Sequence, residues 1–114
     1  MNYNNDPEAT KVRQWRHVLQ RTFLSFNKPM KELNMPTMDQ LFKDIESYQD
    51  MTSEYIAFSK IGKVMRHITL LDPSKIPLED QYKFRERAKK LMDQWNTILE
   101  ADRVVEKVVE IRIT

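Results

Sequence analysis

The chain has no cysteine and only one glycine among its 114 residues. The lack of cysteine excludes disulfide bonds and thiolate metal ligands, and it favours a reducing compartment. The shortage of glycine argues against a β-rich fold, because hairpin turns use positive φ angles that glycine adopts most easily. It also leaves no glycine-rich loop that could bind a phosphate group. Both absences favour an all-α protein.

Long apolar runs and a strong excess of charge are also missing. No run approaches the ~20 apolar residues that a membrane-spanning helix needs. Residues 1–6 are polar and lack the basic and then apolar order of a secretory signal. The 19 basic and 17 acidic residues leave a net charge of +2, which alone does not indicate a dedicated nucleic-acid-binding protein. We expect one domain without membrane association.

Residue patterns typical of catalysis or metal binding are sparse. The two histidines, His17 and His67, have no partner at the spacing of metal ligands. Glu46 and Asp50 are four residues apart, but nothing around them indicates the pocket that acid–base catalysis needs to separate two pKa values. The sequence therefore predicts a protein that is not an enzyme and that binds no cofactor or metal.

Apolar residues at helical spacing predict five helices, at about residues 7–27, 37–48, 53–58, 60–71 and 78–101. Asp6 and Pro7 form the start signal of the first helix, and Thr37 with Gln40 has the capping-box spacing for the second. Thr52 or Ser53 is the expected cap of the third helix, and Ser59 that of the fourth. The apolar stripe of the first helix is Val12, Trp15, Leu19, Phe23 and Phe26, and that of the fourth is Ile61, Val64, Met65 and Ile68. The single glycine, Gly62, is expected to let the fourth helix pack closely on the third.

The last segment is ambiguous, because its valines suit a helix while Val109, Ile111 and Ile113 alternate as in a strand. A helix that frays is favoured. The expected organisation is a single helical domain over residues 1–114, with a core at about 6–101 and a helical extension or frayed tail at 102–114.

Two groups of residues, one basic and one apolar, are candidates for binding. The basic run from Lys83 to Lys90 is either the solvated face of an amphipathic helix or a grip for phosphates. Apolar residues also lie in two predicted loops, which contain Met30, Leu33 and Met35 in one and Leu70, Leu71 and Ile76 in the other. They either close the end of the bundle or form a shallow notch, bordered by lysines, for an aromatic residue of an acidic, disordered partner.

Two motifs resemble the N-terminal domain family of transcription elongation factor TFIIS, which also occurs in Elongin A and a Mediator subunit. The family motif (T/S)-x-(I/V)-G-(K/R)-x-(V/L) is matched by Ser59-Lys-Ile-Gly-Lys-Val-Met65. The family's last helix carries A-x-x-L-(V/I)-x-x-W, matched at Ala88, Leu91, Met92 and Trp95. The arrangement is similar to the integrase-binding domain of lens-epithelium-derived growth factor and related PWWP chromatin proteins. The likeness covers roughly residues 37–99.

This resemblance implies a compact right-handed bundle of about five helices, excised from a larger nuclear protein. It implies an adaptor of the transcription elongation and chromatin machinery that binds short linear motifs in disordered partners. Carried over by position, the resemblance predicts a peptide-binding notch formed by Met30, Lys31, Leu33, His67, Ile68 and Leu70, with Lys60, Lys63 and Arg66 as its basic border.

Two other functions remain open from the sequence. One is a helical domain that binds nucleic acid through Lys83 to Lys90, although direct binding would be weak for a net charge of +2. The other is a structural subunit of a chromatin complex, with an apolar C-terminal segment that pairs with a fixed partner. The expected partners are acidic and aromatic linear motifs of transcription or chromatin factors, and the domain itself is expected to be monomeric.

Overall fold

The computed structural model describes the backbone of residues 3–113 and the side chains of residues 3–103. These residues form an all-α fold without a strand, as the sequence predicts. The helices are α1 (Pro7–Phe23), α2 (Met35–Ser47), α3 (Ser53–Ser59), α4 (Ile61–Thr69), α5 (Glu79–Tyr82) and α6 (Phe84–Ile113). Three short 3-10 turns, η1 (Tyr3–Asn5), η2 (Glu32–Asn34) and η3 (Pro73–Lys75), lie between or before them.

Helix α1 starts where the sequence predicts and ends earlier. The Asp6 carboxylate accepts hydrogen bonds from the backbone N–H groups of Glu8, at 2.9 Å, and Ala9, at 3.4 Å, so it is the N-cap. The last helical residue is Phe23, and the predicted inward position of Phe26 is wrong, since its side chain is 99% exposed. Ser25 and Asn27 favour turns over helix, which accounts for a stop well before Pro29.

The predicted capping box of the second helix is also wrong. Helix α2 begins at Met35, so Thr37 already lies inside it, and the preceding residue Asn34 makes no side-chain cap bond. Proline is tolerated in the first helical turn, and Pro36 therefore permits this earlier start. The extra turn places Met35, expected in an exposed loop, in the core.

Short polar side chains define the two ends of α3. The Thr52 hydroxyl accepts a hydrogen bond from the Tyr55 backbone N–H at 3.1 Å, so Thr52 is the cap, one of the two residues that the sequence allows. The buried Ser59 hydroxyl accepts from the Ile61 backbone N–H at 3.2 Å and so supports the start of α4. Between the two helices, Lys60 adopts a left-handed conformation with φ 60°. The chain can therefore turn sharply from α3 into α4.

The predicted fifth helix is divided in two. Lys83, with φ 57°, separates the single turn of α5 from α6. The Glu79 carboxylate accepts hydrogen bonds from the backbone N–H groups of Phe84, at 2.7 Å, and Arg85, at 3.2 Å. Because these groups open α6 and have no partner within the helix, Glu79 acts as its cap from one turn upstream.

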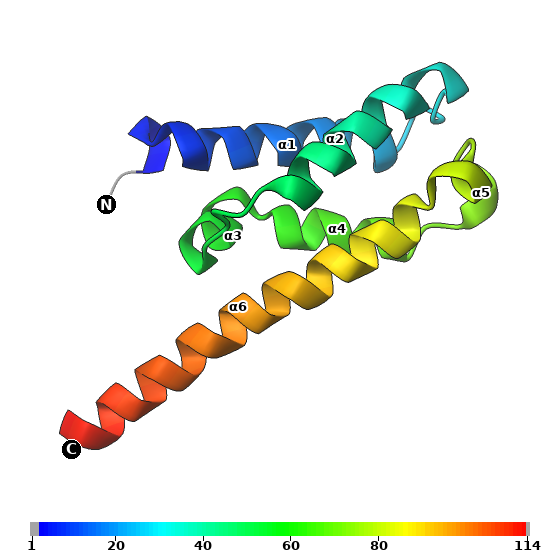
Figure 1. Ribbon diagram of the computed structural model, residues 1–114. Coiled ribbons are helices and arrows are strands. Elements are labelled where there is room, and N and C mark those ends of the chain that lie inside the picture. The colour runs from blue at the N-terminus through cyan, green and yellow to red at the C-terminus, as the bar shows by residue number, and fades with distance from the viewer. Residues whose placement is uncertain (1–2, 114) are drawn as a thin grey trace.

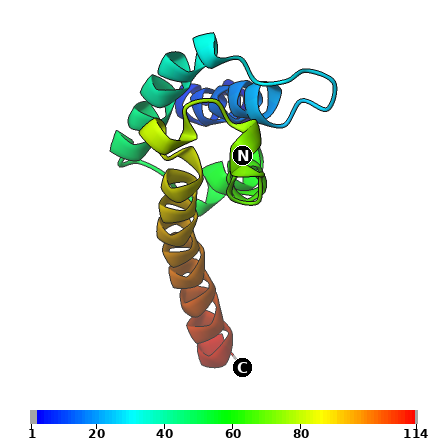
Figure 2. The same ribbon diagram turned by 90° about the vertical axis from the view of Figure 1, so that its right-hand side faces the viewer.

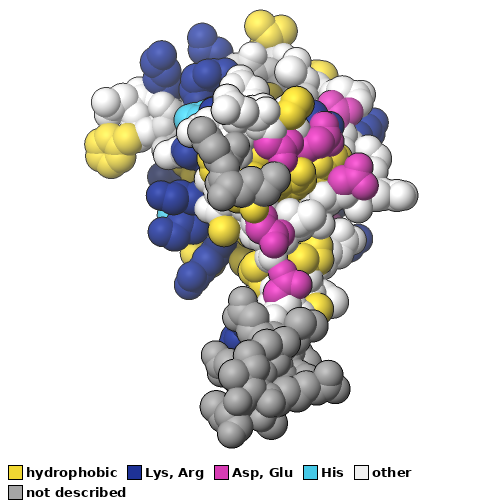
Figure 3. Space-filling view, turned by 90° about the vertical axis from the view of Figure 1, so that its left-hand side faces the viewer, with side chains coloured by type: hydrophobic (Ala, Val, Ile, Leu, Met, Phe, Trp, Pro, Cys, Tyr) yellow, Lys and Arg dark blue, Asp and Glu magenta, His cyan; other side chains and the backbone are white. Residues whose placement is uncertain are grey.

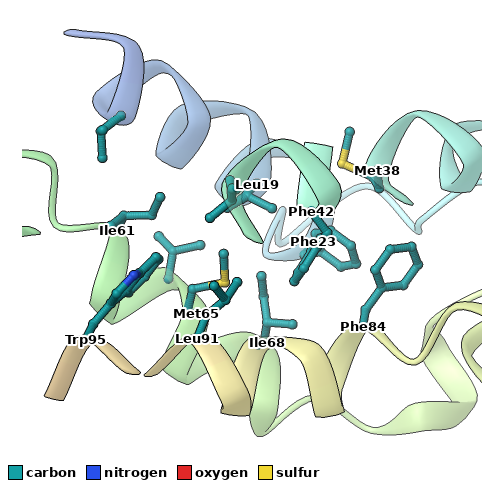
Figure 4. Packing of buried hydrophobic residues seen from close by; sticks show 14 of the residues in the cluster. Leu19, Phe23, Met38, Phe42, Ile61, Met65, Ile68, Phe84, Leu91 and Trp95 are labelled. Carbon is teal, nitrogen blue, oxygen red and sulfur yellow. The ribbon is translucent and has the colours of Figure 1, made fainter. Parts of the chain in front are cut away.

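Helix α4 is the centre of the packing and lies against both α1 and α6. The core contains four residues of α4 (Ile61, Val64, Met65 and Ile68), and all four inward positions confirm the prediction. Figure 4 shows the aromatic side chains of Phe23, Phe42 and Phe84 close together, with ring centroids 5.2 to 6.1 Å apart. Trp95 lies beside Ile61 in the same view.

Helix α6 gives the molecule its elongated shape. The other helices gather around its first half, and its second half extends away from them (Figures 1 and 2). The extents are 55 × 28 × 26 Å. The backbone of the ambiguous last segment is helical through Ile113, while its side chains beyond Arg103 and Thr114 itself lie outside the described residues.

Candidate functional site

A hollow of about 540 Å³ opens between α3, α4 and α6. We call it the α3–α4–α6 hollow. It is lined by Ile56, Ala57, Lys60, Gly62, Lys63, Arg66, Met92, Trp95, Asn96 and Leu99. Its size falls within the range of pockets that bind small ligands or single large side chains.

The floor of this hollow is apolar. Trp95, which is 5% exposed, and Ile56 belong to the core, and the half-buried Met92 and Leu99 pack against that core. Gly62 contributes no side chain. A Cβ at this position would meet the Ile56 Cγ2 at 3.7 Å, which is an ordinary contact. The packing of α4 on α3 therefore does not require glycine, contrary to the prediction from the sequence.

The border of the hollow is positively charged. Lys60, Lys63 and Arg66, here called the basic rim, are exposed, and among the described residues none of them forms an ion pair. The first turn of α4 also lies here and contains no acidic residue. The partial positive charge of this helix end therefore adds to the rim. Among the described residues no acidic side chain lines this hollow, but Glu54, Glu100 and Asp102 line the adjoining hollow that shares Ala57, Asn96 and Leu99 with it. Attraction of an anionic group is therefore expected on the α4 side, along the basic rim.

The structure divides the residues of the predicted notch. The basic border of the prediction lines the α3–α4–α6 hollow, whereas Met30 and Lys31 line a separate hollow of about 210 Å³ with Arg21 and Asn34. Ile68 is 0% exposed and belongs to the core, so it presents no surface to a ligand.

The remaining notch residues lie at the surface. Leu33 and Leu70 are 85% and 71% exposed, and His67 is exposed. None of the three lines the hollows described here. A notch that joins the two loops stays a prediction.

The run from Lys83 to Lys90 is not a uniform basic face. The Arg87 side chain lies between α2 and α6, where its guanidinium pairs with Asp39 at 2.8 Å and with Glu46 at 2.8 Å. It also lies over the rings of Phe42 and Phe84, at 5.2 and 5.8 Å from their centroids. Lys89 pairs with Asp93 at 2.6 Å. Two of its cations are thus neutralised by neighbours, which weakens the phosphate-binding interpretation.

The contacts of Arg87 with Asp39 and Glu46 are reflected in the pKa values of Asp39 and Arg87. Burial disfavours the charged form of Asp39, but hydrogen bonds from Lys43 and Arg87 outweigh it and hold the pKa of the carboxyl below its ordinary value of 3.8. Hydrogen bonding to Glu46 is the main cause that raises the pKa of Arg87, with a further contribution from Asp39. Both shifts have the direction expected of a charged pair that the contacts between α2 and α6 stabilise.

Of the residues that line the hollow, the sequence predicted only the basic rim as part of a binding site, and it missed Ile56, Ala57, Gly62, Met92, Trp95, Asn96 and Leu99. Met92, Asn96 and Leu99 follow one another at spacings of three and four on α6, and Ala57 faces them from α3. The signal in the sequence is a second helical stripe beside the one that contains Leu91 and Trp95. That stripe could have been found from its period, but not the fact that α3 and α4 leave it partly uncovered.

Two features are absent from the described part of the chain. No group of three or more His, Cys, Asp or Glu side chains there has the arrangement of a metal site. No helix there combines the length and the apolar character that crossing a membrane requires. Comparison of the chain with protein-family models, curated proteins and solved structures finds no match.

Proposed function

We propose that this domain is a non-catalytic interaction module that binds short acidic linear motifs through the α3–α4–α6 hollow. One observation carries the proposal: an open hollow with an apolar floor is bordered by three exposed cations without an ion-pair partner among the described residues. An apolar side chain of the motif fills the hollow, and acidic residues beside it lie against the basic rim.

The two parts of this site have different effects on binding. Burial of one large apolar side chain contributes roughly 1.5–3 kcal/mol and accounts for most of the affinity. The rim charges mainly raise the association rate and select acidic over basic motifs. A module of this kind binds weakly and reversibly, as is typical of disordered partners.

The partner class rests on the sequence resemblance to the TFIIS N-terminal domain. It suggests an acidic, disordered region of a transcription elongation or chromatin factor, and hence a nuclear role. The basic rim and apolar floor are compatible with such a region, because acidic disordered regions with single aromatic residues offer both the charge and the apolar anchor.

The test is titration calorimetry with a synthetic peptide that carries one phenylalanine between aspartate and glutamate residues. Asn96→Trp should abolish binding, because Asn96 is exposed at the edge of the hollow and an indole there fills the space without disturbing the core. Lys63→Gln with Arg66→Gln should weaken binding less and mainly lower the association rate. Lys75→Gln with Lys90→Gln, which removes two exposed charges elsewhere, is the matched control.

The same titration decides between the hollow and the predicted loop notch. Leu33 and Leu70 are exposed, so Leu33→Asp and Leu70→Asp should leave the fold intact. We expect both variants to bind the peptide as the wild type does. If these two variants lose binding and Asn96→Trp binds fully, the α3–α4–α6 hollow is not the peptide-binding site and the predicted loop notch is favoured.

A further inference from the structure

The charges of this chain are strongly segregated despite the small net charge. No acidic residue occurs in residues 9–31 or in residues 55–71. The first stretch holds six Lys and Arg residues and the second holds three, together with both histidines of the chain. All 17 acidic residues therefore lie elsewhere, where they outnumber the remaining cations.

The fold brings these two stretches together, because α1 packs against α4. The Arg16 guanidinium donates to the Ser59 carbonyl at 3.0 Å, and Arg13 lies over the Phe58 ring at 5.0 Å. Figure 3 shows most of the Lys, Arg and His side chains in view along one side of the molecule, and the Asp and Glu side chains, with a few Lys or Arg, toward the other. We call this surface the basic face; its members are Arg13, Arg16, His17 and Arg21 of α1 and Lys60, Lys63, Arg66 and His67 of the α3–α4 segment.

Every cation that forms an ion pair within the described residues lies outside the basic face, although unpaired cations such as Lys75 and Lys90 lie outside it too. Arg87, Lys43, Lys89 and Arg103 all pair with carboxylates. Lys11 pairs with Glu8 and lies over the Trp15 and Tyr48 rings, so it is not part of the face. Within the described residues, no Lys or Arg of the basic face forms an ion pair.

Two arginines of the face are held in place by neutral groups. Arg13 donates to the Asn4 side-chain oxygen at 2.9 Å, and Arg16 donates to the Ser59 carbonyl and to the Gln20 side chain. These contacts orient the guanidinium groups and leave their full charge available to an anion.

We infer that the partner carries an extended acidic tract beside its apolar anchor, and that this tract crosses α4 and ends on α1. The inference rests on the proposed function, since the basic rim belongs both to the hollow and to the basic face. Continuity with the hollow favours an acidic polypeptide over a nucleic acid, because a nucleic acid has no aliphatic or aromatic side chain on a flexible backbone to place in an apolar pocket beside its charges. The tract adds long-range attraction that falls as salt screens it.

The experiment compares two synthetic peptides by fluorescence anisotropy at low salt. Both contain the phenylalanine anchor with two acidic neighbours, and the longer one continues into a glutamate tract. For the wild type, the tract should tighten binding by about tenfold or more. The double variant Arg13→Gln, Arg21→Gln should lose most of that gain and bind the short peptide as the wild type does, because neither residue lines the α3–α4–α6 hollow.

A control keeps the total charge the same. Lys75→Gln with Lys90→Gln removes two exposed cations outside the acid-free stretches and should retain the gain from the tract. Circular dichroism and thermal melting confirm that each variant is folded.

The outcomes separate the two proposals. If the wild type binds both peptides with equal affinity, the inferred acidic tract is contradicted and the proposed function is unaffected. Binding of the long peptide alone, with dependence on Arg13 and Arg21, would support the tract and contradict the hollow. If the wild type binds neither peptide, both the proposed function and the inferred tract are contradicted. If a DNA duplex displaces the long peptide at equal charge concentration, the partner is a nucleic acid and the inference of an acidic polypeptide is wrong.

Discussion

At the scale of single residues, Arg87 shows how one side chain serves packing and charge together. Its guanidinium pairs with two carboxylates of α2, donates to the Tyr82 and Asp39 carbonyls, and covers two core phenylalanines. Arg87→Gln should lower the free energy of unfolding by about 2–3 kcal/mol, because a partly buried pair of carboxylates loses its cation. Urea denaturation measures this.

Lys89→Gln is the matched control, because Lys89 is two residues away and makes an exposed pair with Asp93. Its effect should stay within about 0.5 kcal/mol. Similar losses for the two variants would contradict the structural role of Arg87.

Asp39 makes the same network sensitive to acid. The folded state holds the pKa of its carboxyl below the ordinary value of 3.8, so the folded state binds the proton less readily than the unfolded chain. The resulting stability is present in full above pH 3.8 and is lost as the pH falls below it toward the folded-state pKa. We expect urea midpoints to drop in this window, and Asp39→Asn to be less stable at pH 7 with a shallower acid dependence. An unchanged acid profile in Asp39→Asn would show that other carboxyls dominate.

At the scale of helices, the sequence predicts which segments are helical better than where they break. Periodicity and caps identify α1, α3 and α4, because Asp6, Thr52 and Ser59 act through local hydrogen bonds. The break at Lys83 has no such local signal. It depends on a left-handed residue and on the Glu79 carboxylate, whose two bonds to the start of α6 exist only after the chain has turned.

The shortage of glycine has a consequence at these breaks. Lys60, Leu78 and Lys83 take the left-handed conformation that glycine usually provides. Lys60→Gly should therefore raise the free energy of unfolding by about 1 kcal/mol, because it removes the steric penalty of a Cβ at φ 60°. The same change removes one cation of the basic rim and should weaken binding of the acidic peptide.

Thermal melting and titration of this one variant separate the two effects. Lys60→Ala is the control, since it removes the charge and keeps the Cβ. It should weaken binding to the same extent without the gain in stability. A loss of stability in Lys60→Gly would contradict the left-handed turn.

At the scale of the whole molecule, the candidate site could be predicted only in part. The basic rim follows from the sequence, because Lys60, Lys63 and Arg66 recur every three residues opposite the apolar side of α4. The floor does not, because it combines α3 with a stripe of α6 about forty residues later, and such a pairing is set by tertiary packing. The joining of two acid-free stretches into one face depends on the packing of α1 on α4 for the same reason.

This segregation of charge has a cost in stability. Lys60, Lys63 and Arg66 repel one another at spacings of three, and Lys63 lies in the first turn of α4, where a cation opposes the helix dipole. Lys63→Glu removes this repulsion and places an anion at the favourable helix end. We expect it to raise the free energy of unfolding by about 0.5–1 kcal/mol at low salt, and the gain to shrink as salt is added.

The same substitution should weaken binding of the acidic peptide, since it puts a carboxylate on the border of the hollow. Melting curves and titrations of one preparation measure both effects. Residues that serve binding are often less favourable for stability than other residues at the same position would be. A gain in stability together with a loss of affinity in Lys63→Glu would identify Lys63 as such a residue. Lys63→Gln should fall between the wild type and Lys63→Glu in both. A Lys63→Glu variant that gains stability and binds the peptide unchanged would show that the basic rim does not contact the ligand.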